Sequence, residues 1–124
     1  MSTELSTEPI PLRQRLRAAL SAAMKTRDRH ATTALRAALG AIDNAEAIDA
    51  QDVRAGAIET SAVGVGAADR RRRDLTEADM VRIVRTEVDE RLTAAAEYEN
   101  LGQAERAAKL RAEAAALTVH LPAD

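Results

Sequence analysis

The sequence predicts an all-α protein of about four helices, arranged as two helical hairpins joined by a long loop. Apolar residues recur three and four positions apart along four segments, which is the repeat of a helix with one buried face. Most glycines and prolines stand between these segments or at their ends, where they interrupt helices. The 124 residues include one tyrosine, no tryptophan and no phenylalanine, so aliphatic side chains must form the core. Because alanines bury little area, we expect a modest core in one elongated domain.

The first predicted helix follows a tail, residues 1–9, that we expect to be flexible. It begins near residues 9–12, because proline is tolerated in the first turn of a helix, and it ends near Arg27. The second helix is expected to start after Asp28, whose carboxylate can cap it, and to fade near residues 48–49. The buried stripes of the two helices are expected to be Leu12, Leu16, Ala19, Leu20, Ala23 and Met24, and Ala34, Leu35, Ala38, Leu39, Ile42 and Ala45.

Glycines point to two further features. Gly40 lies inside the second apolar stripe and weakens that helix by about 1 kcal/mol relative to alanine, so we interpret it as the mark of a close helix crossing. Residues 49–75 lose the helical pattern and are predicted to form a long mobile loop, with a faint strand-like run at 62–65. The Gly-Val-Gly sequence at 64–66 suggests a phosphate-binding loop. No hydrophobic strand precedes it and no Gly-Lys-Ser/Thr follows, which favours a flexible linker.

The third predicted helix starts after Thr76, which can act as its N-cap, with Asp79 three residues later in a capping box. It is expected to end just before Gly102, which takes the left-handed conformation that closes many helices. The fourth helix is expected to occupy residues 104–120 and to be ended by Pro122. The buried positions of the two helices are expected to be Met80, Val84, Val88, Leu92, Ala95 and Tyr98, and Leu110, Ala114, Leu117 and Leu121.

Two charged residues, Arg91 and Glu113, interrupt mostly apolar neighbourhoods on the third and fourth helices. We interpret them as a partly buried ion pair that joins these helices. The loss of one partner of such a pair is strongly destabilising, because it leaves the other charge buried and uncompensated.

Several kinds of function find no support in the sequence. The absence of cysteine removes disulfides, thiolate catalysis and thiolate metal sites. His30 and His120 lie far apart and lack accompanying carboxylates, so we expect neither a metal nor another cofactor. No serine stands in a nucleophile context, and we expect no catalytic residue. The first residues contain Glu4 and Glu8 and no apolar run, and no window approaches the ~20 apolar residues of a membrane span, so we expect a cytoplasmic protein without membrane contact.

The charge is unevenly distributed, although the net charge is only −2. Residues 11–40 carry seven basic side chains and one acidic side chain. A local excess of this kind attracts polyanions. The candidate nucleic-acid-binding residues are Arg13, Arg17, Lys25, Arg29 and Arg36, together with the run Arg70, Arg71, Arg72 and Arg73. Two alternatives stay open: a solvated charged surface in a protein whose genome favours arginine, and an arginine run that only keeps a loop soluble.

The chain resembles the GatB/YqeY family along most of its length. The residues that carry the resemblance are Leu35–Arg36, Ile42–Glu46 with Asn44 at its centre, Arg91, Tyr98, Gly102, Glu113 and Leu121–Pro122. Their order and spacing follow the family's landmarks. Gln103 stands where the family usually has a basic residue, and His120 replaces a tyrosine. The sequence at 64–71 is similar to actinobacterial members. Family members usually continue into a second small helical bundle; this sequence stops two residues after Pro122, so we expect that bundle to be lacking.

The resemblance implies a single helical domain at 10–122, similar to the tail of the GatB subunit of the glutamine-dependent tRNA amidotransferase. In that enzyme the tail contacts tRNA and the chemistry takes place elsewhere. The family label is carbon–nitrogen ligase activity with glutamine as amido donor. We therefore expect a non-catalytic, tRNA-associated accessory module, with Asn44, Arg91, Tyr98, Gly102, Glu113 and Pro122 as structural motif residues.

Two rival functions are compatible with the same sequence. The first is a helical module that binds a protein partner or forms a homo-oligomer without binding RNA. The second is an enzyme related to the amidotransferases, which predicts glutaminase or ammonia-transfer activity. The absence of a recognisable nucleophile argues against the enzyme.

Overall fold

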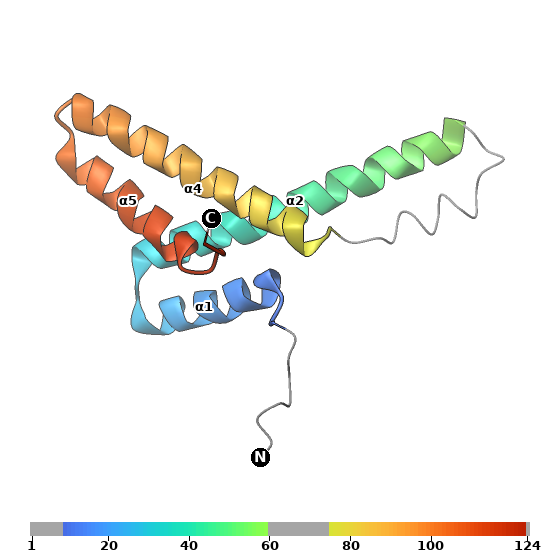
Figure 1. The fold of residues 1–124 in the computed structure, drawn as a ribbon, viewed down its shortest axis with the longest axis horizontal. Helices are drawn as coiled ribbons and strands as arrows, with labels where there is room; N and C mark the ends of the chain where they lie inside the picture. Colours follow the sequence, from blue (N-terminus) through green and yellow to red (C-terminus); the bar gives the residue numbers. More distant parts are fainter. Residues whose placement is uncertain (1–8, 60–74, 124) are drawn as a thin grey trace, which may run out of the picture.

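The computed structural model describes residues 9–59 and 75–123, and within these ranges it is all-helical (Figure 1). The helices are α1 (Leu12–Thr26), α2 (Arg29–Glu59), α4 (Glu77–Asn100) and α5 (Ala104–Thr118). The described part of the chain contains no strand, which confirms the all-α prediction. Helices α1 and α2 form one hairpin, and α4 and α5 form the second.

Helix α2 is the common support of the molecule, since it contacts each of the other three helices. The C-terminal end of α5 lies against the first half of α2, and the start of α4 crosses α2 near its middle (Figure 1). Beyond this crossing the second half of α2 extends away from the other helices, which gives the molecule an elongated outline. The two hairpins therefore pack together at one end of α2 only.

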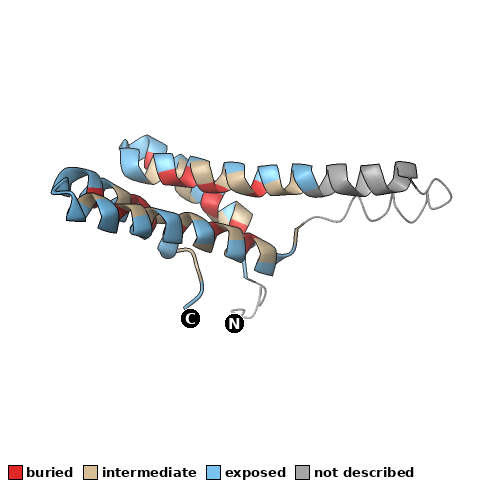
Figure 2. Cartoon of the chain, turned by 90° about the horizontal axis from the view of Figure 1, so that it is seen from above, coloured by how far each residue is buried: buried red, intermediate tan, exposed pale blue. Residues whose placement is uncertain are grey.

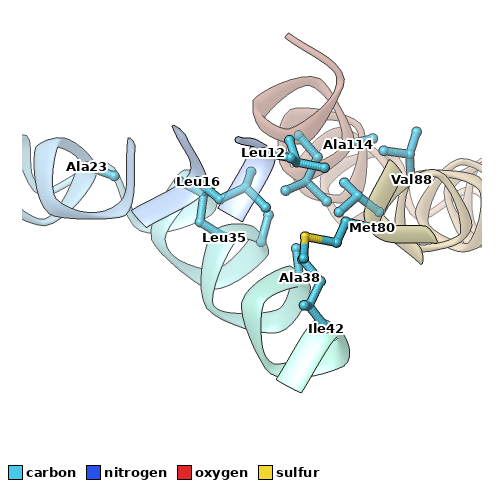
Figure 3. Close-up of a cluster of buried hydrophobic side chains, with 12 residues drawn as sticks. Leu12, Leu16, Ala23, Leu35, Ala38, Ile42, Met80, Val88 and Ala114 are labelled. Atoms are coloured by element: carbon cyan, nitrogen blue, oxygen red, sulfur yellow. The ribbon is translucent and has the colours of Figure 1, made fainter. Parts of the chain in front are cut away.

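The core lies where the four helices meet (Figure 3). Aliphatic side chains and alanines fill it, as the near absence of aromatic residues predicts. Figure 2 shows the buried positions as short stripes along the facing sides of the helices. The largest fully buried side chains are Leu12, Leu16, Leu35, Ile42, Val84 and Leu117.

Two residues of the predicted stripes are exposed, and in both cases helix geometry explains the error. Met24 is 50% exposed. It lies seven residues after Arg17, which is about two helical turns, so it shares the polar side of α1 with that arginine. Leu92 is 46% exposed because apolar residues repeated every four positions drift around a helix of 3.6 residues per turn. By Leu92 the drift from Met80 reaches about 120°, so the stripe has rotated out of the core.

The predicted helix ends are formed by local hydrogen bonds. Ala31 N donates to Asp28 Oδ1 at 3.1 Å, which confirms the N-cap of α2. At the start of α4, Asp79 N donates to Thr76 Oγ1 at 3.0 Å and Thr76 N donates to Asp79 Oδ2 at 3.1 Å, which completes the capping box. The bond from Thr76 N–H lowers the pKa of the Asp79 carboxyl below its ordinary value. Gly102 has φ 79° and closes α4 as predicted.

A contact across the fold takes the place of a local cap at the start of α1. Pro11 supplies no side-chain cap, and Leu12 N donates instead to Glu77 Oε2 of α4 at 2.7 Å. Arg15 lies beside the same carboxylate, with Nη2 3.8 Å from Glu77 Oε2, and its Nη1 donates to the carbonyl of His120 at 2.6 Å. The ends of α1, α4 and α5 are thus tied at one point.

The predicted boundaries need two corrections. Helix α2 continues to Glu59, so the loop predicted at 49–75 is wrong over 49–59. The only breaker in that stretch is Gly56, and one glycine weakens an alanine-rich helix without ending it. Helix α5 ends at Thr118 rather than His120, because the chain tightens into a turn in which the His120 and Leu121 amides bond to carbonyls three residues earlier.

Gly40 does not mark a close helix crossing. It is exposed, and a Cβ added to it meets no atom within 4 Å outside its own helix backbone. The interpretation from the sequence is therefore wrong. A glycine in an apolar stripe shows that a side chain is absent, but it does not show whether another helix packs at that position.

Other predictions fall outside the described residues: the tail at 1–8, the strand-like run at 62–65, the glycine sequence at 64–66 and the arginines at 70–73. Among the described helices, none is both long enough and apolar enough to cross a membrane.

Gly40 and Gly102 should respond oppositely to substitution by alanine. Gly40→Ala is expected to stabilise the protein by about 0.5–1 kcal/mol, since the helix gains propensity and nothing obstructs the methyl group. Gly102→Ala is expected to destabilise it by about 1 kcal/mol, since φ 79° is strained for an L-residue. Urea unfolding followed by circular dichroism at 222 nm measures both. A destabilised Gly40→Ala protein would contradict the assignment of Gly40 to open space.

Acidification should destabilise the protein through His120. Burial, and secondly the charge of Arg15, lower the pKa of the His120 imidazole below its ordinary value of 6.5. As the pH falls through that value the unfolded chain takes up the proton first, so stability declines and levels off below the folded-state pKa. His120→Gln should flatten the dependence of the urea midpoint between about pH 7.5 and 5.5. The matched control is His30→Gln, which removes an exposed histidine at the start of α2.

Candidate nucleic-acid interface

The structure divides the basic residues of the α1–α2 hairpin into two groups. Arg13 and Arg15 belong to the first group, which holds the fold together. Arg13 Nη2 lies 2.7 Å from Glu46 Oε1 and 3.5 Å from Asp43 Oδ1, and its side chain is 20% exposed. Arg15 joins Glu77 at the meeting point of the helix ends. The assignment of Arg13 to nucleic-acid binding therefore has little support, because carboxylates already surround its guanidinium group.

The second group is exposed and consists of Arg17, Lys25, Arg27, Arg29 and Arg36. Among the described residues, none of these side chains pairs with a carboxylate. The closest acidic residue in the sequence, Asp28, accepts the capping bond from Ala31 N. Arg36 has one polar neighbour, Met24 Sδ, at 3.8 Å from Nη2. This end of the hairpin therefore carries a local positive charge that described carboxylates leave unpaired.

Two contacts between α1 and α2 show which residues share a face of the hairpin. Arg13 reaches Asp43 and Arg36 reaches Met24, so these four residues lie on the same side. Arg17 is four residues after Arg13, which places it on that side as well. By the same rule Arg29 shares the face, since it is seven residues before Arg36 on α2. We call Arg17, Arg29 and Arg36 the basic face.

Lys25 and Arg27 extend the basic face at the turn between the two helices. Arg27 adopts φ 61° and closes α1, its amide bonding to the carbonyls of Ala23 and Met24. Gly40 lies one turn after Arg36 on the same face and adds no side chain there. A polyanion approaching the hairpin at this end therefore meets cations and little steric obstruction.

The α4–α5 hairpin has a different electrostatic character. The exposed side of α4 presents Asp89, Glu90 and Glu97 around a shallow hollow. This surface repels polyanions. The fold thus separates a basic surface on α1 and α2, which attracts polyanions, from an acidic surface on α4.

The predicted ion pair between α4 and α5 is present. Arg91 Nε donates to Glu113 Oε1 at 2.9 Å, and the two side chains are 13% and 6% exposed. A second carboxylate completes the cluster: Arg91 Nη1 donates to Glu87 Oε1 at 2.9 Å. Glu87 lies four residues before Arg91, and the sequence interprets this pair only as ordinary spacing on a helix surface. Burial alone lowers the pKa of Arg91, but the bonds and charges of the two glutamates raise it above its ordinary value.

The residues of the family resemblance are only partly brought together. Arg91, Tyr98 and Glu113 follow one seam of the α4–α5 hairpin, and Tyr98 and Glu113 line a common hollow. Pro122 joins the same hairpin, since its carbonyl accepts a bond from Arg85 Nη2 at 2.8 Å. Asn44 is exposed on α2 and does not take part in the seam. These residues therefore organise the second hairpin more than they form one site.

Within the described ranges, no three histidine, aspartate or glutamate side chains are grouped so that they can hold a metal ion. The sequence matches no protein-family model, and no curated protein and no solved structure matches it either.

The cluster around Arg91 should be a major source of stability. Arg91→Met is expected to destabilise the protein by about 3 kcal/mol, because Glu113 keeps a buried charge without its partner. The double variant Arg91→Met/Glu113→Leu should recover most of that loss. The matched control is Arg111→Met, which breaks the exposed pair of Arg111 with Glu99 on the same hairpin and should change stability by less than about 1 kcal/mol. Urea unfolding measures the stability of each variant. If Arg91→Met and Arg111→Met lost the same free energy of unfolding, the cluster around Arg91 would not be a major source of stability.

Proposed function

We propose that this protein is a non-catalytic accessory module that binds structured RNA, in particular tRNA, through contacts to phosphates. The observation that carries the proposal is the basic face, Arg17, Arg29 and Arg36, whose side chains are exposed and unpaired with any described carboxylate. The resemblance to the GatB/YqeY family supports the choice of tRNA. In that family's best-known setting, the tail of an amidotransferase, a helical domain contacts tRNA without performing the reaction.

The arrangement of these arginines suits a phosphate backbone. A guanidinium group grips phosphate with two parallel hydrogen bonds, which a lysine ammonium cannot do. Arg29 and Arg36 are two turns apart, about 10 Å along the axis of α2. The face therefore reaches across several nucleotides. Because rigid helices carry the side chains, few backbone degrees of freedom are lost on binding.

The buried ionisable residues favour a structural role over catalysis. Glu113 is the buried carboxylate of the described core, and Arg91 neutralises it. Both charges of this pair are engaged with each other inside the fold, where Arg91 Nε donates to Glu113 Oε1 at 2.9 Å. We therefore place any chemistry connected with this protein on a partner and not on Glu113.

A protein-interaction module is the second candidate function, and one observation favours it. The second half of α2 extends away from the other helices (Figure 1). Ile48, at the start of this projecting part, is 50% exposed. A helix that extends beyond its own bundle can dock into a groove of a partner or of a second copy. This candidate predicts concentration-dependent association without RNA binding.

Reversing charges on the basic face should weaken RNA binding. Fluorescence anisotropy of labelled tRNA is expected to give micromolar affinity that falls steeply between about 50 and 200 mM salt. Arg17→Glu/Arg36→Glu should lower that affinity at least about tenfold and reduce the salt dependence, because two phosphate contacts are lost. The matched control is Arg82→Glu/Arg111→Glu, which changes the net charge equally on the α4–α5 hairpin and should have a much smaller effect.

Two results would overturn the proposal. Equal weakening in both double variants would mean that net charge, and not the basic face, governs binding. A complete absence of tRNA binding at low salt would favour the interaction module, which analytical ultracentrifugation over a range of protein concentrations then tests.

A further inference from the structure

A hollow on the α4–α5 hairpin lies apart from the basic face and combines features that the proposed phosphate contacts do not use. Its volume is about 380 Å³. The residues that line it are Tyr98, Arg106, Lys109, Leu110 and Glu113. Tyr98 is the only aromatic residue of the chain, and it is half-buried, so its ring is anchored while part of it stays accessible.

A cation covers the tyrosine ring. The guanidinium carbon of Arg106 lies 5.5 Å from the centre of the Tyr98 ring. Arg106 is exposed and pairs with no described carboxylate, so the ring contact is its principal interaction. A flat guanidinium group on an aromatic face occupies the position that a planar ligand takes when it stacks there. Because Arg106 is on the surface, it can move aside and leave this face of the ring to such a ligand.

The electrostatics of the hollow favour an anion. Lys109 is three residues after Arg106, so the two cationic groups lie on the same side of α5. Lys109 also pairs with no described carboxylate, whereas Arg111 of the same helix pairs with Glu99. Glu113 is the one acidic residue that lines the hollow, and Arg91 neutralises it at 2.9 Å. The remaining charge beside the tyrosine ring is therefore positive.

We propose that this hollow binds one nucleotide of a single-stranded RNA segment, with the base stacked on Tyr98 and the adjoining phosphate held by Arg106 and Lys109. An aromatic platform next to cations is the arrangement by which single-stranded nucleic acids are bound without strict sequence preference. Leu110 supplies an apolar wall for the base or sugar. The inference rests on the proposed function for its choice of RNA, and it adds a second site that recognises an unpaired nucleotide.

The single tyrosine provides a direct readout, since the protein has no tryptophan and its emission reports Tyr98 alone. Titration of the full chain with AMP and with a five-nucleotide oligoadenylate should quench this emission. Free N-acetyltyrosinamide in the same titration corrects for light absorbed by the nucleotides. Lys109→Gln should weaken the apparent affinity for the oligonucleotide about tenfold, because one charge-assisted phosphate contact is lost. The matched control Arg111→Gln, on the same helix, should stay within about twofold.

Substitution of the ring itself tests the stacking directly. With a fluorescein-labelled oligoadenylate, Tyr98→Phe should keep its affinity because the aromatic face remains, and Tyr98→Leu should lose about tenfold. Circular dichroism at 222 nm establishes that each variant is folded. Equal affinity of the leucine and phenylalanine variants would overturn the proposal, as would quenching by ribose 5-phosphate as strong as that by AMP.

The test of the hollow can be distinguished from the test of RNA binding by the basic face. If Arg17→Glu/Arg36→Glu abolishes tRNA binding while AMP still quenches Tyr98, the hollow is a nucleotide site of its own. If tRNA binds but neither AMP nor the oligoadenylate affects Tyr98 emission, the protein binds RNA and the proposal for the hollow is wrong.

Discussion

The two hairpins depend on one polar junction, where the ends of three helices meet. Glu77 accepts the Leu12 amide of α1, Arg15 lies beside the same carboxylate, and the Arg15 guanidinium group also binds the His120 carbonyl. A core made of alanine and a few aliphatic residues offers small contact areas with weak directional preference. Directional hydrogen bonds at the helix ends supply the missing specificity, and they set where α1 and α5 cross the support provided by α2.

The packing of the helices also decides which basic side chains remain exposed and unpaired with described carboxylates. The arginines of residues 11–40 are alike in chemistry, but the packing turns Arg13 and Arg15 toward carboxylates of α2 and α4. Arg17, Arg29 and Arg36 are left on the outer side of the hairpin. The positive charge that remains is smaller than the sequence implies, but it is confined to one rigid face. The local arrangement of basic side chains on one face matters more for positioning a polyanion than the net charge of the protein.

In the second hairpin a buried charge cluster shapes the surface above it. Arg91 holds Glu87 and Glu113 together along the seam between α4 and α5. Because Glu113 is neutralised there, the hollow above it keeps the positive character of Arg106 and Lys109 beside the Tyr98 ring. The residues that resemble a family motif thus stabilise the hairpin and, in our proposal, also prepare a site on it.

The sequence by itself determined the helical class, the start of each described helix and the caps at Asp28, Thr76 and Gly102, because periodicity and capping depend on residues a few positions apart. It also indicated the Arg91–Glu113 pair, since both charges interrupt apolar stripes. Tertiary structure alone decided the Glu77 contact to α1, which spans 65 positions, and the division of the arginines into structural and exposed groups. Those outcomes depend on which helix faces meet, and no local pattern in the sequence encodes that arrangement.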